Sequence, residues 1–106
     1  MKLLIVVIQA DDTPRVVEAL THSGYRVTKI ATLGGWLRKA NTTLLIGLND
    51  NQVWHATKLL RRLAGQRTEL RLSHGDPAVG LAPEEVLVEV GGLTLFELDV
   101  ERAEQL

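Results

Sequence analysis

The sequence contains no cysteine, and this absence removes several kinds of chemistry at once. Without thiols the chain can form neither a disulfide framework nor a thiolate metal site, and it has no cysteine nucleophile. The three histidines, His22, His55 and His74, fall in three different predicted elements and are not paired at the spacing of metal ligands. The sequence therefore predicts no metal site, and we expect no cofactor.

An excess of positive charge is also missing. The 12 Lys and Arg residues are balanced by 13 Asp and Glu residues, which leaves a formal net charge of −1. Proteins that bind the phosphates of a nucleic-acid duplex usually have more Lys and Arg than Asp and Glu residues, so no DNA or RNA partner is expected. The acidic pairs Asp11–Asp12 and Glu84–Glu85 have no visible partner for acid–base catalysis, and we predict that the protein is not an enzyme.

The N-terminal apolar run is too short for a membrane segment. In MKLLIVVIQADD, the polar residues Gln9, Asp11 and Asp12 end the run too early for a signal peptide or a membrane span. We interpret it as a buried first strand of a cytoplasmic protein without a membrane partner.

Length and composition are those of one globular domain over residues 1–106. The chain has 45% hydrophobic and 24% charged residues, which are ordinary values, and its small size favours support from an oligomer. Apolar runs and turn residues predict strands at 2–9, 25–33, 42–48, 67–72, 85–90 and 93–98. Two helices are expected, one capped by Asp12 or Thr13 and ended by Gly24, the other capped by Asp50 or Asn51 and ended by Gly65.

The first 72 residues contain an internal repeat. LLI at 3–5 returns as LLI at 44–46, and Gly24-Tyr25-Arg26 aligns with Gly65-Gln66-Arg67. Because each half contains a strand, a helix and a strand, we predict an α+β fold: a ferredoxin-like double βαβ antiparallel sheet with both helices on one face. Strand 67–72 ends the second unit. The strands at 85–90 and 93–98 are then extra C-terminal strands, which often cover an open edge or reach a neighbouring subunit.

Two further segments carry weaker signals. Residues 73–83 contain two glycines and two prolines, a composition that favours a loop. After the last strand, Asp99 is expected to cap a short terminal helix that runs through Gln105.

Residues 26–47 join two strands through a segment unlike an ordinary hairpin turn. Gly34 and Gly35 permit close backbone approach, and Trp36 offers a large flat face. Asn41 and the two threonines after it supply compact donors and acceptors, and four cations surround the group. These residues indicate a ligand-binding segment, although a flexible connection with a partly buried Trp36 would use the same residue types.

The sequence resembles the PII-like family of bacterial cyclic di-AMP receptors over nearly the whole chain. The similarity rests on the opening KLLIVVIQ, on RVTKIATLGGWL followed by NTT and IG, and on the terminal VEVGGLTLFEL with Gln105 nearby. The resemblance implies a homotrimer of ferredoxin-like subunits that binds cyclic di-AMP in clefts between neighbours. It implies a receptor that signals to an unknown protein partner through movement of its loops, at 34–40 and 73–83.

The resemblance also implies roles for nine residues. Thr28 and Asn41 would read one adenine edge beside the backbone of Gly47; the main-chain groups of Gly35, Trp36 and Leu37 would hold the phosphate–ribose ring; Arg26 would add charge; Phe96 and Gln105 would approach the same cleft. Two features depart from the family. Trp36 stands where Phe is commoner, and the loop at 73–83 is shorter than the family's large loop.

Three alternatives remain open on the sequence alone. An ATP- or ADP-binding PII-type regulator would share the trimer, but it should need a stronger cluster of cations. A small hydrolase on a ferredoxin-like scaffold would need an Arg and an Asn converging on one anion-binding loop, and no such signature is visible. In a structural trimer with a vestigial pocket, Trp36 would pack into the interface.

Overall fold

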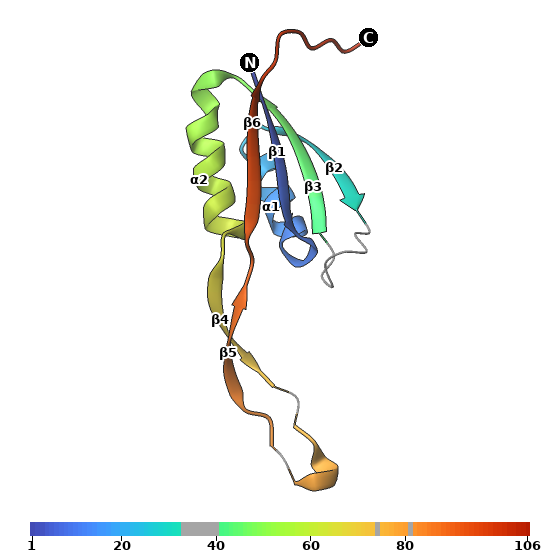
Figure 1. Ribbon diagram of the computed structural model, residues 1–106, viewed down its shortest axis with the longest axis vertical. Coiled ribbons are helices and arrows are strands. Elements are labelled where there is room, and N and C mark those ends of the chain that lie inside the picture. The colour runs from blue at the N-terminus through green and yellow to red at the C-terminus, as the bar shows by residue number, and fades with distance from the viewer. Residues whose placement is uncertain (33–40, 74, 81) are drawn as a thin grey trace.

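Four strands form one antiparallel sheet, and both α-helices cover a single face of it (Figure 1). The structure, a computed structural model, describes residues 1–32, 41–73, 75–80 and 82–106. The elements, in chain order, are β1 (Lys2–Gln9), α1 (Thr13–His22), β2 (Arg26–Thr32), β3 (Asn41–Leu48), α2 (Val53–Ala64), β4 (Arg67–Leu72), β5 (Glu85–Val90) and β6 (Leu93–Asp99). Single turns of 3-10 helix at Ala10–Asp12, Asp50–Gln52 and Pro77–Val79 complete them.

The strand order of the sheet is β2-β3-β1-β6, and every neighbouring pair is antiparallel. The predicted α+β fold with an antiparallel sheet and two helices on one face is confirmed. The double βαβ repeat, however, assigned strand 67–72 to the place beside β1, and β6 takes that place instead. The reason lies in composition: β6 offers apolar residues to both faces of the sheet, whereas three of the six residues of β4, RTELRL, are charged.

The hydrophobic core lies between the sheet and the two helices. Alternate residues of β1 and β3 point toward the helices, as the two-residue period of a strand requires. The fully or almost fully buried side chains are Leu4, Val6, Ile8, Val16, Leu20, Leu44, Ile46, Leu48, Ala56, Leu60 and Ala64. The intervening residues of the same strands must therefore point to the opposite face, which neither α1 nor α2 covers.

The strands β4 and β5 pair only with each other and form a hairpin that extends away from the sheet (Figure 1). Its length gives the molecule extents of 62 × 28 × 19 Å. The radius of gyration, 17.5 Å, exceeds the value of about 13 Å for a compact domain of roughly this length. Leu70, Leu72 and Leu87 are exposed on the hairpin. Because a two-stranded hairpin is only marginally stable by itself, its attachment to the domain matters.

A buried carboxylate attaches the base of the hairpin to the domain. Asp12 was expected to cap α1, but its side chain makes no capping hydrogen bond. Its carboxylate instead accepts hydrogen bonds from Arg67 at 2.7 Å and from Arg15 at 2.8 Å. The bond to Asp12 raises the pKa of the Arg67 guanidinium above its ordinary value, and Arg67 also donates to Glu69 at 3.0 Å, which lowers the pKa of that carboxyl.

The start of α2 and the C-terminal segment also differ from expectation. Neither Asp50 nor Asn51 caps α2 directly, because both lie in the 3-10 turn that precedes it; within this turn the N–H of Asn49 donates to Gln52 Oε1 at 2.9 Å. Residues 100–106 form no helix. The carboxylate of Asp99 pairs with Lys2 on the neighbouring strand, which lowers the pKa of Asp99 and removes it as a cap.

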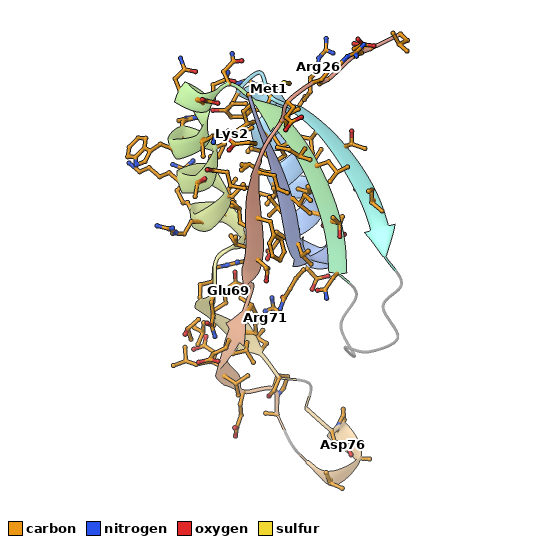
Figure 2. The ribbon with its side chains drawn as sticks, turned by 45° about the horizontal axis from the view of Figure 1, so that its top comes forward. Met1, Lys2, Arg26, Glu69, Arg71 and Asp76 are labelled. Carbon is orange, nitrogen blue, oxygen red and sulfur yellow. The ribbon has the colours of Figure 1, made fainter. Side chains whose placement is uncertain are left out.

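The tip of the hairpin is partly ordered by local hydrogen bonds. The predicted loop at 73–83 contains the turn Pro77–Val79, where Asp76 accepts a bond from the Ala78 N–H at 3.0 Å. Figure 2 shows Asp76 at the end of the molecule farthest from Met1. No helix among the described residues has the length and hydropathy that a membrane crossing requires.

Candidate functional site

The face of the sheet opposite the helices, here called the open face, carries most of the predicted site residues. Strand alternation and register place three complete rows of residues across its four strands, in the order β2, β3, β1, β6. The first is Arg26, Gly47, Leu3, Leu98 and the second is Thr28, Leu45, Ile5, Phe96. A third row contains Ile30, Thr43, Val7 and Thr94. The face is therefore apolar at its centre and polar at Arg26 and Thr28 of β2.

One end of β2 gathers four of the predicted residues. Arg26 lies directly opposite Gly47, and Thr28 is the next residue of β2 on the same face. The Arg26 guanidinium donates to Gln105 Oε1 at 3.1 Å, although β2 and β6 are opposite edges of the sheet (Figure 2). The C-terminal segment therefore crosses back to this corner, and a terminal residue without regular secondary structure joins the other predicted residues there.

Gly47 leaves this corner open beside the cation. A Cβ at this position would lie 3.6 Å from the end of the Met1 side chain, an ordinary contact, so glycine is not required for packing here. Its absence of a side chain leaves backbone exposed between Arg26 and Leu3. A planar group could approach the backbone at this point, as the predicted role of Gly47 requires.

Phe96 lies on the same face but at the other edge. It shares a row with Thr28, three strand spacings away, which is roughly 14 Å at about 4.8 Å per spacing. The ring is 55% exposed. Within one subunit, therefore, Phe96 and Thr28 do not contact one purine, and the structure does not bring these two predicted residues together.

Asn41 lies at the far end of β3, half-buried, and is paired in register with Thr32 of β2 and Gln9 of β1. Asn41 is four positions along β3 from Leu45, the register partner of Thr28, so the two residues predicted to read one adenine edge are also roughly 14 Å apart. The segment at 33–40 connects Thr32 to Asn41. Gly35, Trp36 and Leu37 belong to it and lie outside the described residues.

The chemistry of the open face suits an anionic ligand with aromatic rings. Arg26 supplies a cation with planar donors, Thr28 a hydroxyl, Gln105 an amide and Phe96 a stacking surface. No group of His, Cys, Asp or Glu within the described ranges could hold a metal ion. The groups that the described residues offer to an anion are therefore side-chain donors that would contact it directly.

The apolar residues of the open face were not among the predicted site residues. Ile5 and Leu45 lie at its centre, and Ile30 and Leu98 are more than 40% exposed toward its edges. The signal was present in the sequence, since the first strand, KLLIVVIQ, is apolar at nearly every position rather than at alternate ones. Such a run is expected where both faces of a strand are covered, and among the described residues helices cover only one face.

Comparison with known proteins identifies the family. The family model described as cyclic-di-AMP receptor matches residues 1–106, the whole chain. The chain belongs to the cyclic di-AMP receptor family. The PII-like family suggested by the sequence motifs is thereby confirmed, and with it a receptor family whose ligand is cyclic di-AMP.

A solved structure agrees with the fold. The chain is similar to a protein from Pediococcus pentosaceus ATCC 25745, described as functionally unknown, with a TM-score of 0.80 and 28% sequence identity. The match covers 99% of this chain and 96% of that protein. The similarity in fold to that protein therefore extends over nearly the whole of both chains.

Proposed function

We propose that this protein is a homotrimeric receptor that binds cyclic di-AMP between subunits, at the corner of the open face formed by Arg26, Thr28, Gly47 and Gln105. The observation that carries the proposal is the placement of these residues. Side chains predicted from distant parts of the sequence share one uncovered face of the sheet, and Gln105 is bonded to Arg26 across 79 positions of the chain.

The position of Phe96 supports a site made by two subunits. Because Phe96 and Thr28 lie at opposite edges of one sheet, a neighbour's Phe96 can approach this subunit's Thr28 only if unlike edges of two copies meet. Such a contact is heterologous, and a heterologous contact that closes on itself forms a ring. The apolar centre of the open face, around Ile5 and Leu45, would be buried in that ring, as the composition of β1 requires.

The chemistry of the proposed ligand matches the side chains found at this corner. Cyclic di-AMP carries two phosphates and two adenines, so it needs cations or N–H donors and flat surfaces. Arg26 offers charge to a phosphate, and stacking of a base on an aromatic ring contributes roughly 1–3 kcal/mol in other systems. Gly35, Trp36 and Leu37 are proposed to hold the phosphate–ribose ring with their main-chain groups, and Asn41 to read an adenine edge.

Signalling requires that the ligand bind one arrangement of the protein better than another. The size of any shift is limited by that difference in affinity. The connection at 33–40 runs between Thr32 and Asn41, which are paired in register, and the base of the hairpin lies at the same end of the sheet, where Asn41 and Gly91 line one pocket (Figure 1). We assign the response to the first of these segments and contact with a protein partner to the surface that it changes.

Isothermal titration of the purified protein with cyclic di-AMP, cyclic di-GMP, ATP and ADP, with and without magnesium, tests the proposal. We expect cyclic di-AMP to bind selectively near one molecule per subunit without magnesium, and to be recovered unchanged. Magnesium-dependent ATP binding in place of cyclic di-AMP binding would assign the protein to the nucleotide-triphosphate regulators, and hydrolysis of the ligand would make it an enzyme. Either result would overturn the proposal.

A further inference from the structure

The outer surface of α2 carries a stripe of one aromatic and two basic side chains. Trp54, Lys58 and Arg62 follow one another at intervals of four residues, so they lie on one face of the helix. All three are exposed, Trp54 to 72%, whereas Ala56 and Leu60 are buried in the core. The stripe therefore contributes little to the packing of the domain, and its residues are free to contact another molecule.

A small hollow lies along the stripe. Its volume is about 240 Å³, and it is lined by Trp54, His55, Lys58, Leu59 and Arg62. Leu59 is only 9% exposed and gives the hollow an apolar surface. Pockets that enclose a small-molecule ligand usually have about 300–1,000 Å³, so this hollow suits one inserted side chain better than a whole ligand.

The Trp54 ring is held in place by its neighbour in the stripe. The ammonium nitrogen of Lys58 lies 4.8 Å from the centre of the ring, a cation–π contact. A side chain that is already ordered loses little conformational entropy when a partner binds. Trp and Arg are also the residue types that most often dominate the binding energy of protein interfaces. Trp54 and Arg62 thus have the chemistry of interface anchors.

The charge around the stripe is positive. The two α-helices together contain four Lys and Arg residues and one Glu, although the whole chain has a net charge of −1. Within the part of the chain that the structure describes, neither Lys58 nor Arg62 has a carboxylate partner. Two cations four positions apart repel each other. The helix dipole favours Arg62 in the last turn, but it accounts for neither Lys58 nor Trp54.

Acidic residues of the adjoining elements do not neutralise the stripe. Among the described residues, none of those that line the hollow is Asp or Glu. Asp50, one turn before Trp54, is paired with the N-terminal amine of Met1 at 3.0 Å. Glu18, the acidic residue of α1, lines a different cavity beside Lys29. The stripe therefore favours an occupant that brings carboxylates.

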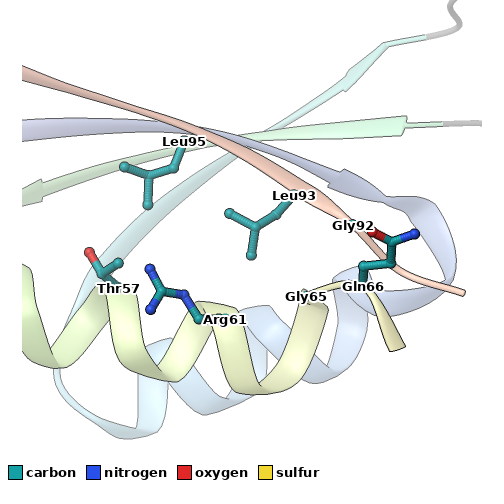
Figure 3. A pocket seen from close by; sticks show the side chains of 7 residues that line it. All are labelled: Thr57, Arg61, Gly65, Gln66, Gly92, Leu93 and Leu95. Atoms are coloured by element: carbon teal, nitrogen blue, oxygen red, sulfur yellow. The ribbon is translucent and has the colours of Figure 1, made fainter. Parts of the chain in front are cut away.

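The other flank of α2 has a different environment. Figure 3 shows Arg61 directed toward Leu93 and Leu95 of β6. Strand alternation places Glu97 on the same face of β6 as these leucines, so this flank has an acidic residue as well as a cation. Arg61 is therefore not part of the stripe, and it provides a control for substitutions there.

We propose that the stripe of Trp54, Lys58 and Arg62 is a docking surface for an acidic segment of a partner protein. The segment would insert one apolar side chain into the hollow, against Trp54, and place carboxylates against Lys58 and Arg62. Complementary charge determines the sign of the partner, and the small hollow limits insertion to one side chain.

The proposed trimer leaves this surface accessible. Its open faces are turned inward, and the stripe lies on the helical side of the sheet, where it needs no strand edge. The inference goes beyond the receptor function, because the stripe shares no residue with the proposed ligand contacts. It is a contact separate from the ligand-dependent one assigned to the connection at 33–40.

Other occupants fit the stripe less well. A helix that lies on a membrane inserts a continuous apolar face, whereas the apolar face of α2 is buried in the core and Trp54 alone represents large exposed apolar side chains in this fully described helix. A second copy that docked through the same surface would bring like charges together, which disfavours the contact.

A random peptide library displayed on phage tests the proposal, with the full-length protein as bait. We expect the enriched peptides to contain acidic residues on both sides of an apolar residue. The affinity of a synthetic enriched peptide should fall about tenfold with Arg62→Glu, because one facing charge is reversed. Arg61→Glu is the matched control, since it changes the net charge equally on the other flank of α2, and it should leave the affinity within about twofold.

Substitution of the aromatic residue tests the hollow. Trp54→Ala should lower the peptide affinity about tenfold or more, as truncation of a central interface anchor does. Trp54→Phe keeps an aromatic ring at this position and should restore most of the affinity. Because Trp54 is outside the core, both variants are expected to fold, and circular dichroism checks this expectation.

Four results would overturn the inference. They are a library without any peptide whose binding depends on the stripe, enrichment without an acidic bias, equal losses with Arg62→Glu and Arg61→Glu, and an affinity that Trp54→Ala leaves unchanged.

Two further measurements identify the other occupants. Cosedimentation with vesicles of phosphatidylcholine and phosphatidylserine that Arg62→Glu abolishes would assign the stripe to a membrane. Self-association of trimers that Arg62→Glu abolishes would assign it to a second copy. Either result would overturn the partner assignment. Cyclic di-AMP titration of the same variants separates this test from the receptor function, because their ligand affinity is expected to stay unchanged.

Discussion

Arg26 and Lys29 are cations three positions apart on the same strand, and their side chains lie on opposite faces of the sheet. Arg26 lies on the open face, whereas Lys29 lines a cavity beside α1 with Pro14 and Val17. We expect Arg26→Ala to weaken cyclic di-AMP binding by about tenfold or more, because a hydrogen bond to a charged group contributes about 1.5–3 kcal/mol. Lys29→Ala should change the affinity by no more than about twofold, since an exposed charge on the far face is screened.

Isothermal titration at two salt concentrations distinguishes contact from general charge. A direct contact by Arg26 predicts that the difference between the two variants persists at high salt. If both variants lose the same affinity at low salt and neither loses affinity at high salt, the two residues act only through the electrostatic potential around β2. Arg26 would then not belong to the site.

The role of a single residue was hardest to predict from sequence where its interaction partner lies far away along the chain. Asp12 and Asp99 both have the position and residue type of a helix cap, and local reasoning assigned each of them that role. Asp12 instead pairs with Arg67 and Asp99 with Lys2, which lie 55 and 97 positions away. A carboxylate that can cap a helix can equally accept from a guanidinium or ammonium group, and only the fold determines which donor is near.

At the scale of elements, the Asp12–Arg67 contact joins the hairpin to the domain. Asp12 is 4% exposed, and its loss leaves a partly buried guanidinium with one partner fewer. Removing one member of a buried pair costs about 3–5 kcal/mol, and the partial exposure of Arg67 reduces our expectation for Asp12→Ala to about 1–2 kcal/mol of unfolding free energy. Urea denaturation measures this loss.

The neighbouring carboxylate supplies the control for this substitution. Asp11 is exposed, so Asp11→Ala should stay within about 0.5 kcal/mol of the native protein. Amide exchange should also quicken in β4 and β5 more than in β1 and β3 when Asp12 is replaced. Uniform acceleration throughout the sheet would contradict a local role at the base of the hairpin.

Most elements could be predicted from sequence, but their pairing could not. The apolar runs and glycine stops located six strands and two helices, because periodicity and turn chemistry are local properties. The internal repeat then suggested that strand 67–72 closes the sheet. Nothing local distinguishes a strand beside β1 from a strand that turns away, since the choice depends on whether β4 or β6 gives the better contact with β1 over its full length.

At the scale of the whole molecule, the residues of the proposed site were predicted for a different reason, and they stay a prediction. The residues around Arg26 came from similarity to a family, and the fold then placed Arg26, Thr28, Gly47 and Gln105 at one corner. The separation of Thr28 from Phe96 was not visible in the sequence, because it follows from the order of strands in the sheet. That separation is the reason for expecting two subunits at each site.

The proposed trimer makes a prediction that couples assembly to ligand binding. Ile30 is 42% exposed on the open face, so Ile30→Asp should leave the subunit folded while placing a charge in the proposed interface. Buried unpaired charge is costly, and we expect sedimentation to show a species near 11.7 kDa in place of one three times heavier. Leu87→Asp, at a 72% exposed position on the hairpin, is the matched control and should leave assembly unchanged.

The cyclic di-AMP affinity of the same two variants tests whether assembly and ligand binding are coupled. If each site needs two subunits, Ile30→Asp should lose cyclic di-AMP binding together with the trimer, although Ile30 is not among the proposed ligand contacts. A trimer that persists in this variant would show that the open face is not the interface. A dissociated subunit that still binds cyclic di-AMP with native affinity would show instead that one chain forms the whole site, and Phe96 would then have no part in it.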